Sequence, residues 1–305
     1  MILAPDRMDW RRDGRDWPNR ALSRFPQAAG RRWHVQRGGT GPRILLLHGT
    51  GAATHSWRDV LPRLIARAEV LAPDLPGHGF SAMPSVYRLS LAAMAEDIGA
   101  LCAAEDFRPD VIVGHSAGAA IALAMTLGGH ARPGQIVGFG GALTPFRGAA
   151  GILFPAFARM LSMNPLTARV VARTASDRSS VRRLIAGTGS RIDARGVDLY
   201  ARLIAHPAHI RAVLAMMARW ELDGLSIALP ALATPTLLVT GGADRAVPEE
   251  ETRRLANAWP AAEHRHVPAL GHLLHEEAPG MAAEIILEAA RTATRPRLAL
   301  AVAGA

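Results

Sequence analysis

The chain has 305 residues, of which 49% are hydrophobic and 20% are charged, a composition that excludes an extended disordered protein. The formal net charge is +9, and all 35 residues counted as lysine or arginine are arginines. Because these arginines are scattered and no aromatic residues interleave with them in a binding motif, the charge does not indicate a nucleic-acid partner.

Two further features bear on where the protein works. No apolar run reaches the roughly 20 residues of a membrane-spanning helix, so we expect no transmembrane segment, although the positive charge leaves peripheral membrane contact open. Several aspartates among the first twenty residues argue against a secretory signal, and the single cysteine, Cys102, excludes an internal disulfide. We therefore expect a cytoplasmic protein.

From residue 33 onwards, short apolar runs alternate with segments of helical periodicity. This alternation is typical of βαβ units and predicts an α/β fold, with a mostly parallel central sheet flanked by helices. We expect strands at 32–37, forming an edge of the sheet, and at 44–47, 70–72, 111–113 and 135–143, with helices at 91–101 and 117–127.

The strand pattern stops at residue 145, and helical pieces follow one another as far as residue 230. A stretch this long is better explained by a subdomain than by a loop, so we expect a helical cap inserted over the carboxyl edge of the sheet. Strands resume at 236–240 and 264–267, and helices begin near residues 248 and 279. The predicted parts are an N-terminal extension (1–32), a core (33–144 and 231–293), the cap (145–230) and a C-terminal tail (294–305).

The strongest chemical signal is the motif Gly-His-Ser-Ala-Gly at 114–118, which follows a predicted strand and precedes a predicted helix. This context is typical of a nucleophile on a tight, strained turn that exposes its hydroxyl above the sheet. Residues two before and two after the serine are pressed against neighbouring backbone, so Gly114 and Gly118 suit those positions. We identify Ser116 as the candidate nucleophile.

A serine hydroxyl needs a base to take its proton, and the base needs an acid to hold its tautomer. In proteins with this motif the acid follows the serine and the histidine comes last. We select His272, after the last strand, over His275, one helical turn further on, and over His264 and His266, which alternate along a strand.

Asp244 is the candidate acid, because it ends the loop after the strand at 236–240, which we expect to lie beside the nucleophile strand. The other usual location for the acid, at the end of the strand that stops near Leu143, offers Gly140, Gly141 and Ala142 and no carboxylate. Glu249, Glu250 and Glu251 suit the first turn of a helix instead.

Backbone N–H groups must stabilise the oxyanion that forms during acyl transfer. We expect one N–H donor from Ala117 and a second from the loop at 48–51. Thr50, or a residue directly next to it, is the expected second donor. His48 and Gly49 are predicted to support this loop, and proton transfer by His48 is the lesser alternative. The loop is not a phosphate cradle, because no Gly-Lys-Ser/Thr follows it.

Several other residues have simpler structural explanations. Asp74 is expected to fix a turn through backbone hydrogen bonds rather than act in catalysis. His206 and His209 lie in the predicted cap without a third ligand, so we predict no metal site and no cofactor. A set of apolar side chains suits either packing or the lining of an apolar ligand pocket: Trp57, Met160, Met163, Met216, Met217 and Trp220.

These motifs resemble the α/β-hydrolase superfamily over residues 33–290. Closer likeness is carried by DGRDWPNR at 13–20, SRF at 23–25, WHVQ at 33–36, HGTGAATHSW at 48–57 and APDLPGHG at 72–79. These segments resemble the α/β-hydrolases of bacteriochlorophyll gene clusters, described as magnesium-chelatase accessory proteins. The resemblance implies a role in photosynthetic pigment synthesis near the magnesium-protoporphyrin steps. Serine at position 116 disfavours dehalogenase and epoxide-hydrolase chemistry, which use an aspartate there.

Two functions follow from this resemblance. The first is an esterase-type hydrolase that acts on a small-molecule ester or a tetrapyrrole ester, for which an Arg-rich surface and a Met-rich cap would suit a flat macrocycle with carboxylate arms. The second is a non-catalytic accessory protein that binds a porphyrin or docks on magnesium chelatase subunits. A complete triad favours the first function, and the family description favours the second.

Overall fold

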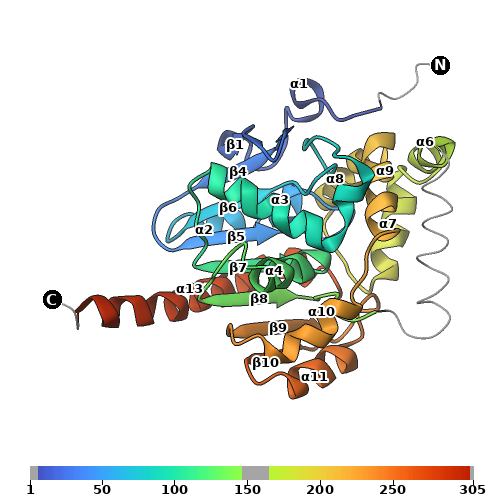
Figure 1. The fold of residues 1–305 in the computed structure, drawn as a ribbon. Coiled ribbons are helices and arrows are strands. Elements are labelled where there is room, and N and C mark those ends of the chain that lie inside the picture. Colours follow the sequence, from blue (N-terminus) through green and yellow to red (C-terminus); the bar gives the residue numbers. More distant parts are fainter. Residues whose placement is uncertain (1–5, 146–164, 303–305) are drawn as a thin grey trace.

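A central sheet of eight strands organises the protein (Figure 1). The computed structural model describes residues 6–145 and 165–302. The strand order is β1-β4-β6-β5-β7-β8-β9-β10, with β4 antiparallel to both of its neighbours and the other pairs parallel. The mostly parallel α/β sheet predicted from the sequence is therefore confirmed. The strands are β1 (Ser23–Arg24), β4 (Val35–Gly38), β5 (Arg43–Leu47), β6 (Glu69–Pro73), β7 (Val111–His115), β8 (Gln135–Phe139), β9 (Thr236–Gly241) and β10 (Ala262–Val267).

Two details of the predicted sheet were wrong. The strand predicted at 32–37 is not an edge, because the two-residue strand β1 pairs with β4 on its outer side. The loop that carries Asp244 does not lie beside the nucleophile strand, since β8 separates β9 from β7. A separate two-stranded sheet is formed by β2 (Gln27–Ala28) and β3 (Arg31–Arg32).

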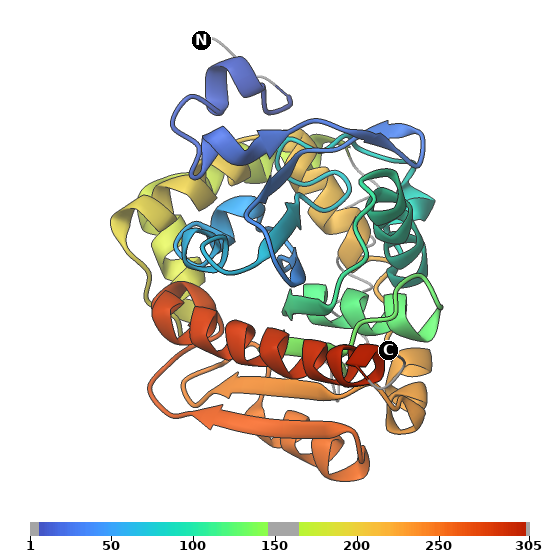
Figure 2. The same ribbon diagram turned by 90° about the vertical axis from the view of Figure 1, so that its left-hand side faces the viewer.

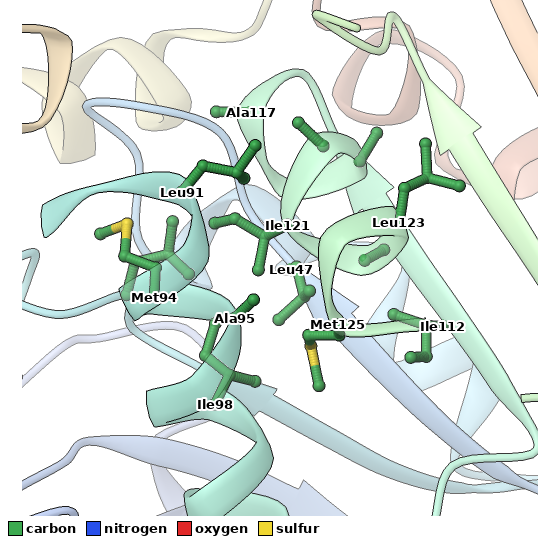
Figure 3. Close-up of a cluster of buried hydrophobic side chains, with 14 of the residues drawn as sticks. Leu47, Leu91, Met94, Ala95, Ile98, Ile112, Ala117, Ile121, Leu123 and Met125 are labelled. Carbon is green, nitrogen blue, oxygen red and sulfur yellow. The ribbon is translucent and has the colours of Figure 1, made fainter. Parts of the chain in front are cut away.

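The central strands are apolar on both faces because each face is covered by helices. On one face Leu45, Leu47 and Ile112 pack against α3 (Leu91–Ala104) and α4 (Ala117–Leu127), whose side chains meet in Figure 3. On the other face Ile44 and Leu46 belong to a second cluster with α2 (Leu61–Leu64) and α13 (Pro279–Val302), which Figure 2 shows running along the sheet. Each fully buried leucine stabilises the fold by about 1.5–3 kcal/mol relative to an exposed one. A one-residue slip of a strand would turn these side chains to the opposite face of the sheet, so their packing fixes the strand register.

The predicted cap is helical wherever the structure describes it. Residues 146–164 of the predicted cap lie outside the described residues, and the described part contains no strand. Its helices have a small core of their own around Val181, Val197 and Ile210. Figure 1 shows α6 (Pro165–Thr174), α7 (Arg178–Gly187), α8 (Ala194–Ile204) and α9 (Pro207–Met217) beyond the carboxyl ends of the parallel strands. The predicted cap also contains α10 (Asp223–Ala228) and η4 (Leu229–Ala231).

The first described residues contact both α8 and α9 of the predicted cap and the loop after β5. Asp6 pairs with Arg211 of α9 at 2.6 Å, and Asp16 pairs with Arg202 of α8 at 2.7 Å. The Trp17 indole N–H donates to Thr54 Oγ1 of the core at 3.0 Å. No helix in the described residues is both long and apolar enough to span a membrane. The remaining elements are α1 (Trp10–Asp13), η1 (Arg20–Leu22), η2 (Thr54–Trp57), η3 (Val86–Leu89), α11 (Glu249–Ala258) and α12 (Leu274–Glu277).

Candidate active site

Ser116 occupies a strained turn between β7 and α4. Its backbone has φ 51° and ψ −116°, a conformation that costs a non-glycine residue on the order of 1–3 kcal/mol. The two flanking glycines leave no room for a side chain. A Cβ at Gly114 would lie 2.2 Å from the Ala119 nitrogen, and one at Gly118 would lie 2.2 Å from the Leu47 oxygen. The turn therefore requires glycine at both positions.

His272 and Asp244 come together after β10 and β9. His272 Nδ1–H donates to Asp244 Oδ2 at 2.9 Å, and the Asp244 carboxylate is fully buried. The other carboxylate oxygen accepts the N–H groups of Ala246 and Val247 at 2.8 and 2.9 Å. Because Nδ1 carries the proton in this pair, Nε2 of His272 is left as an acceptor.

Gly140, directly after β8, packs against this pair, which comes from the loops after the neighbouring strands β9 and β10. It follows β8 with φ +52°, and a Cβ there would lie 3.1 Å from His272 Nδ1 and 3.3 Å from Asp244 Oδ2. The Ser116 N–H donates to the carbonyl of Phe139, the residue before Gly140, at 2.9 Å. The end of β8 therefore contacts all three candidate triad residues.

The structure brings His272 and Asp244 into a hydrogen bond but not Ser116 and His272. Among the residues that the structure describes, no hydrogen bond joins Ser116 Oγ to the His272 ring. The neighbouring His115 does reach the base loop, since its Nε2–H donates to the His272 carbonyl at 3.0 Å and the two rings lie 4.8 Å apart. Catalytic hydrogen bonds commonly tighten only when substrate binds, so this geometry is compatible with a triad.

The predicted oxyanion loop lies against the serine. A Cβ at Gly49 would lie 3.1 Å from the Ser116 Cβ, which places the loop at 48–51 next to the nucleophile. Within the described chain, the N–H groups of Thr50 and Ala117 have no protein acceptor. Two backbone donors are thus available near Ser116.

His48 and Asp74 have structural partners that account for them. His48 Nδ1–H donates to the Gly49 carbonyl at 2.8 Å, and its Nε2 accepts the Leu75 N–H at 2.9 Å. Asp74 accepts the N–H groups of Thr54 and Phe80 as well as His34 Nδ1–H. Burial alone would raise the pKa of Asp74, but the attraction and hydrogen bond of His34 lower it below its ordinary value.

The rival bases are engaged elsewhere. His275 is fully buried, its Nε2 lies 2.6 Å from Ser56 Oγ, and burial holds its pKa well below 6.5. His264 lies 2.7 Å from Thr240 Oγ1, and His266 pairs with Glu249. As predicted, Glu249, Glu250 and Glu251 occupy the first turn of α11.

Sequence reasoning missed a cap loop that braces both the acid and the base. Between α7 and α8, the Thr188 carbonyl accepts the Arg245 N–H at 3.1 Å, and the buried Ser190 Oγ accepts the Leu273 N–H at 2.8 Å. A Cβ at Gly189 would lie 1.7 Å from the Ala243 oxygen. The Gly-Thr-Gly-Ser run at 187–190 indicates a turn in the sequence. Nothing in that local sequence indicates that the turn contacts residues more than fifty positions away.

The remaining predictions concern metals and apolar packing. Within the described ranges, no group of three or more His, Cys, Asp or Glu side chains could hold a metal ion. Trp57 lies in the core, and Met216 is buried beside the oxyanion loop, where its sulfur accepts the Thr50 hydroxyl at 3.7 Å. Met160 and Met163 lie outside the described residues. Whether this set lines a ligand pocket stays a prediction.

Comparison with known proteins decides the family. A model described as the alpha/beta hydrolase family matches residues 44–285, which include every candidate site residue. The chain belongs to the alpha/beta hydrolase family. This confirms the predicted superfamily and fold class.

Two relatives and one solved structure show how similar the chain is to individual proteins. The chain is 41% identical to the "Magnesium-chelatase 30 kDa subunit" of Rhodobacter capsulatus over 92% of this chain and 99% of that protein. It is 30% identical to "Haloalkane dehalogenase 2" of Mycobacterium tuberculosis over 87% and 93% of the two chains. A Burkholderia ambifaria alpha/beta hydrolase fold protein matches with a TM-score of 0.74 at 22% identity, over 88% and 97% of the chains. At that identity the structural match establishes the fold alone.

Proposed function

We propose that this alpha/beta hydrolase is a serine hydrolase of carboxylic esters or similar acyl compounds, with Ser116 as nucleophile, His272 as base and Asp244 as the group that orients the base. The observation that carries the proposal is the 2.9 Å hydrogen bond from His272 Nδ1 to the buried Asp244 carboxylate, beside a serine in a strained turn. This arrangement leaves the His272 Nε2 lone pair to accept a proton, which a purely structural histidine does not need.

The chemistry follows the two halves of acyl transfer. Ser116 Oγ attacks the substrate carbonyl while His272 Nε2 takes its proton, and the tetrahedral intermediate collapses as that proton passes to the departing alkoxide. Water then attacks the acyl-serine ester, gives a proton to His272, and releases the carboxylic acid as Ser116 regains its hydrogen. Asp244 stabilises the imidazolium that forms in both halves.

The oxyanion of each tetrahedral intermediate would be held by the N–H groups of Thr50 and Ala117. Both donors are free of protein acceptors in the described chain, and Ala117 opens α4, whose N-terminus favours negative charge. Loss of one such donor costs about 10²–10³ in kcat in serine hydrolases.

The likeness to a protein named magnesium-chelatase 30 kDa subunit supports a role in bacteriochlorophyll synthesis near the chelatase step. The substrate on this reading is a tetrapyrrole ester or a related small ester. The same name also favours a second candidate, an accessory protein that binds a porphyrin or contacts chelatase subunits without catalysis.

Two measurements separate these candidates. A fluorophosphonate probe should label the wild type and a Ser226→Ala control, which removes a half-buried serine of α10, but not Ser116→Ala. In a strain that lacks the gene, wild type should restore pigment and Ser116→Ala should not. Absence of labelling in the wild type, or full rescue by Ser116→Ala, would contradict the enzymatic role and leave the accessory role.

A further inference from the structure

His209 of α9 lies between two loops of the core. Its ring is 2% exposed, and its two nitrogens each meet a backbone group from a different loop. Nε2 lies 3.2 Å from the Gly51 carbonyl, and Nδ1 lies 3.2 Å from the Gly79 nitrogen. A cap residue therefore joins the loop after β5 to the loop after β6.

The hydrogen-bond partners define one neutral tautomer. A carbonyl can only accept, so Nε2 carries the proton toward Gly51, and Nδ1 accepts the Gly79 N–H. Burial lowers the pKa of His209 to about 4, which keeps the ring neutral near pH 7. Both ring nitrogens are thus satisfied in a fixed orientation.

The whole inner face of α9 contacts these loops. His209, Ala212, Val213 and Met216 follow the i, i+3, i+4, i+7 spacing of one helical face. A Cβ at Gly77 would lie 2.6 Å from the Ala212 Cβ, one at Gly51 would lie 4.0 Å from Val213 Cγ2, and Met216 accepts the Thr50 hydroxyl. The loop next to Ser116 is therefore held from the cap side by packing, by the long hydrogen bond from Thr50 to the Met216 sulfur, and by the shorter bond of His209 to the Gly51 carbonyl.

We propose that His209 is a positioning residue, which holds the Gly51 carbonyl so that the adjacent Thr50 N–H points at the substrate oxyanion. This inference rests on the proposed hydrolase function. Gly51 has φ +79°, a conformation from which an unrestrained glycine moves readily, and a donor displaced by about 1 Å loses much of its effect on a transition state. His209 touches neither substrate nor Ser116, and it acts through the loop.

Three substitutions at one position isolate the bond to Gly51. His209→Leu fills the space but removes both bonds. The amide of His209→Gln reaches the position of Nε2 with a donor and an acceptor, whereas the shorter amide of His209→Asn reaches only the position of Nδ1. His206→Leu is the matched control, because His206 is a buried histidine at the start of the same helix that faces Asp13 instead.

The test measures p-nitrophenyl butyrate hydrolysis and the rate of fluorophosphonate labelling in the full chain. We expect His209→Leu and His209→Asn to lower kcat and the labelling rate at least tenfold, with KM changed less than threefold. His209→Gln should stay within threefold of wild type and His206→Leu within twofold.

The outcomes distinguish this inference from the function on which it rests. If wild type is active and His209→Asn matches His209→Gln in kcat, or His209→Leu loses no more than His206→Leu, the positioning role is overturned while the hydrolase stands. If wild type neither hydrolyses the ester nor takes the label, both proposals fall. Thermal unfolding identifies any variant that does not fold. If His209→Leu does not fold, the comparison of kcat between His209→Asn and His209→Gln decides whether the positioning role stands.

Discussion

His115 and His272 are joined by a hydrogen bond from the His115 Nε2–H to the His272 carbonyl at 3.0 Å. His115 directly precedes the candidate nucleophile and is 3% exposed, so this bond fastens the serine turn to the loop of the candidate base. Burial keeps the pKa of His115 well below 6.5, and the ring acts as a neutral donor. The two loops are therefore held together by a group that takes no part in the proposed proton transfer.

Replacing His115 by phenylalanine should loosen the base. The buried His272 carbonyl would lose its partner, which costs about 1–3 kcal/mol, and the base would shift relative to Ser116. We expect a lower midpoint of urea unfolding and slower fluorophosphonate labelling. His115→Gln, which can still donate, should recover most of the labelling rate, and an unchanged rate in His115→Phe would exclude this role for the bond.

Gly140→Ala should lower ester hydrolysis by more than the strain of a left-handed backbone at alanine can explain. The new Cβ would meet His272 Nδ1 at 3.1 Å and Asp244 Oδ2 at 3.3 Å, so both groups must give way by a few tenths of an ångström, which we expect to disturb their hydrogen bond. Gly129→Ala is the matched control, because Gly129 also has positive φ (+72°) and a Cβ there meets nothing within 4 Å.

Both Gly140→Ala and Gly129→Ala should lose about 1 kcal/mol of unfolding free energy for the left-handed backbone. Only Gly140→Ala should lose ester hydrolysis, by about tenfold or more. Equal activity in the two variants would show that the approach of His272 and Asp244 does not depend on that glycine.

Stability should fall as the pH falls below about 6.5. Burial lowers the pKa values of seven histidines, namely the fully buried His48, His55, His78, His115, His209 and His275 and the partly buried His264. Between the unfolded pKa and the lower folded pKa only the unfolded chain takes up the proton, so each histidine loses its contribution as the pH drops. For His209, with a folded pKa of about 4, the loss is on the order of 3 kcal/mol.

The pH dependence of the contribution from Glu276 has the opposite sign. Burial raises the pKa of Glu276 to about 7, although the attraction of Arg58 lowers it. Its contribution is complete below the unfolded pKa and is lost as the pH rises through 7. Because seven histidines oppose one glutamate, urea midpoints measured from pH 7.5 down to 5 should decrease. The urea midpoint should fall less steeply with pH in His209→Gln, because glutamine does not titrate. A urea midpoint that does not change with pH would contradict the neutral state of the buried histidine rings.

Arg58 should be the most sensitive charge in the core. Its side chain is 4% exposed and pairs with the fully buried Glu276, with Asp193 at the start of α8, and with Asp59. Tyr200 of α8 donates to the other Glu276 oxygen at 2.7 Å. Arg58→Met removes the cation that opposes the effect of burial on Glu276, and above pH 7 leaving that carboxylate ionised without its cation typically costs 3–5 kcal/mol.

A double-mutant cycle tests this pairing. Arg58→Met with Glu276→Gln should recover a large part of the stability lost by Arg58→Met, because the uncompensated charge is gone. Urea unfolding of the wild type, both single variants and the double variant gives the coupling. Strict additivity would mean that the two side chains do not depend on each other.

The sequence by itself determined the local elements and the chemical identities. Apolar runs of three or four residues specify strands such as β5 and β7, because a strand buried on both faces needs no polar alternation. The glycines around Ser116 mark the turn, since only residues without a side chain fit there. These signals lie within a few residues of one another and can be read without coordinates.

The tertiary structure alone decided which distant groups meet. It placed β8 between β7 and β9, packed Gly140 against both His272 and Asp244, and set His209 against Gly51. It also turned Ser190 and His115, which carry no catalytic signature, into anchors of the base loop. Such contacts join residues separated by scores of positions, and their partners are selected by the packing of whole layers rather than by any local pattern.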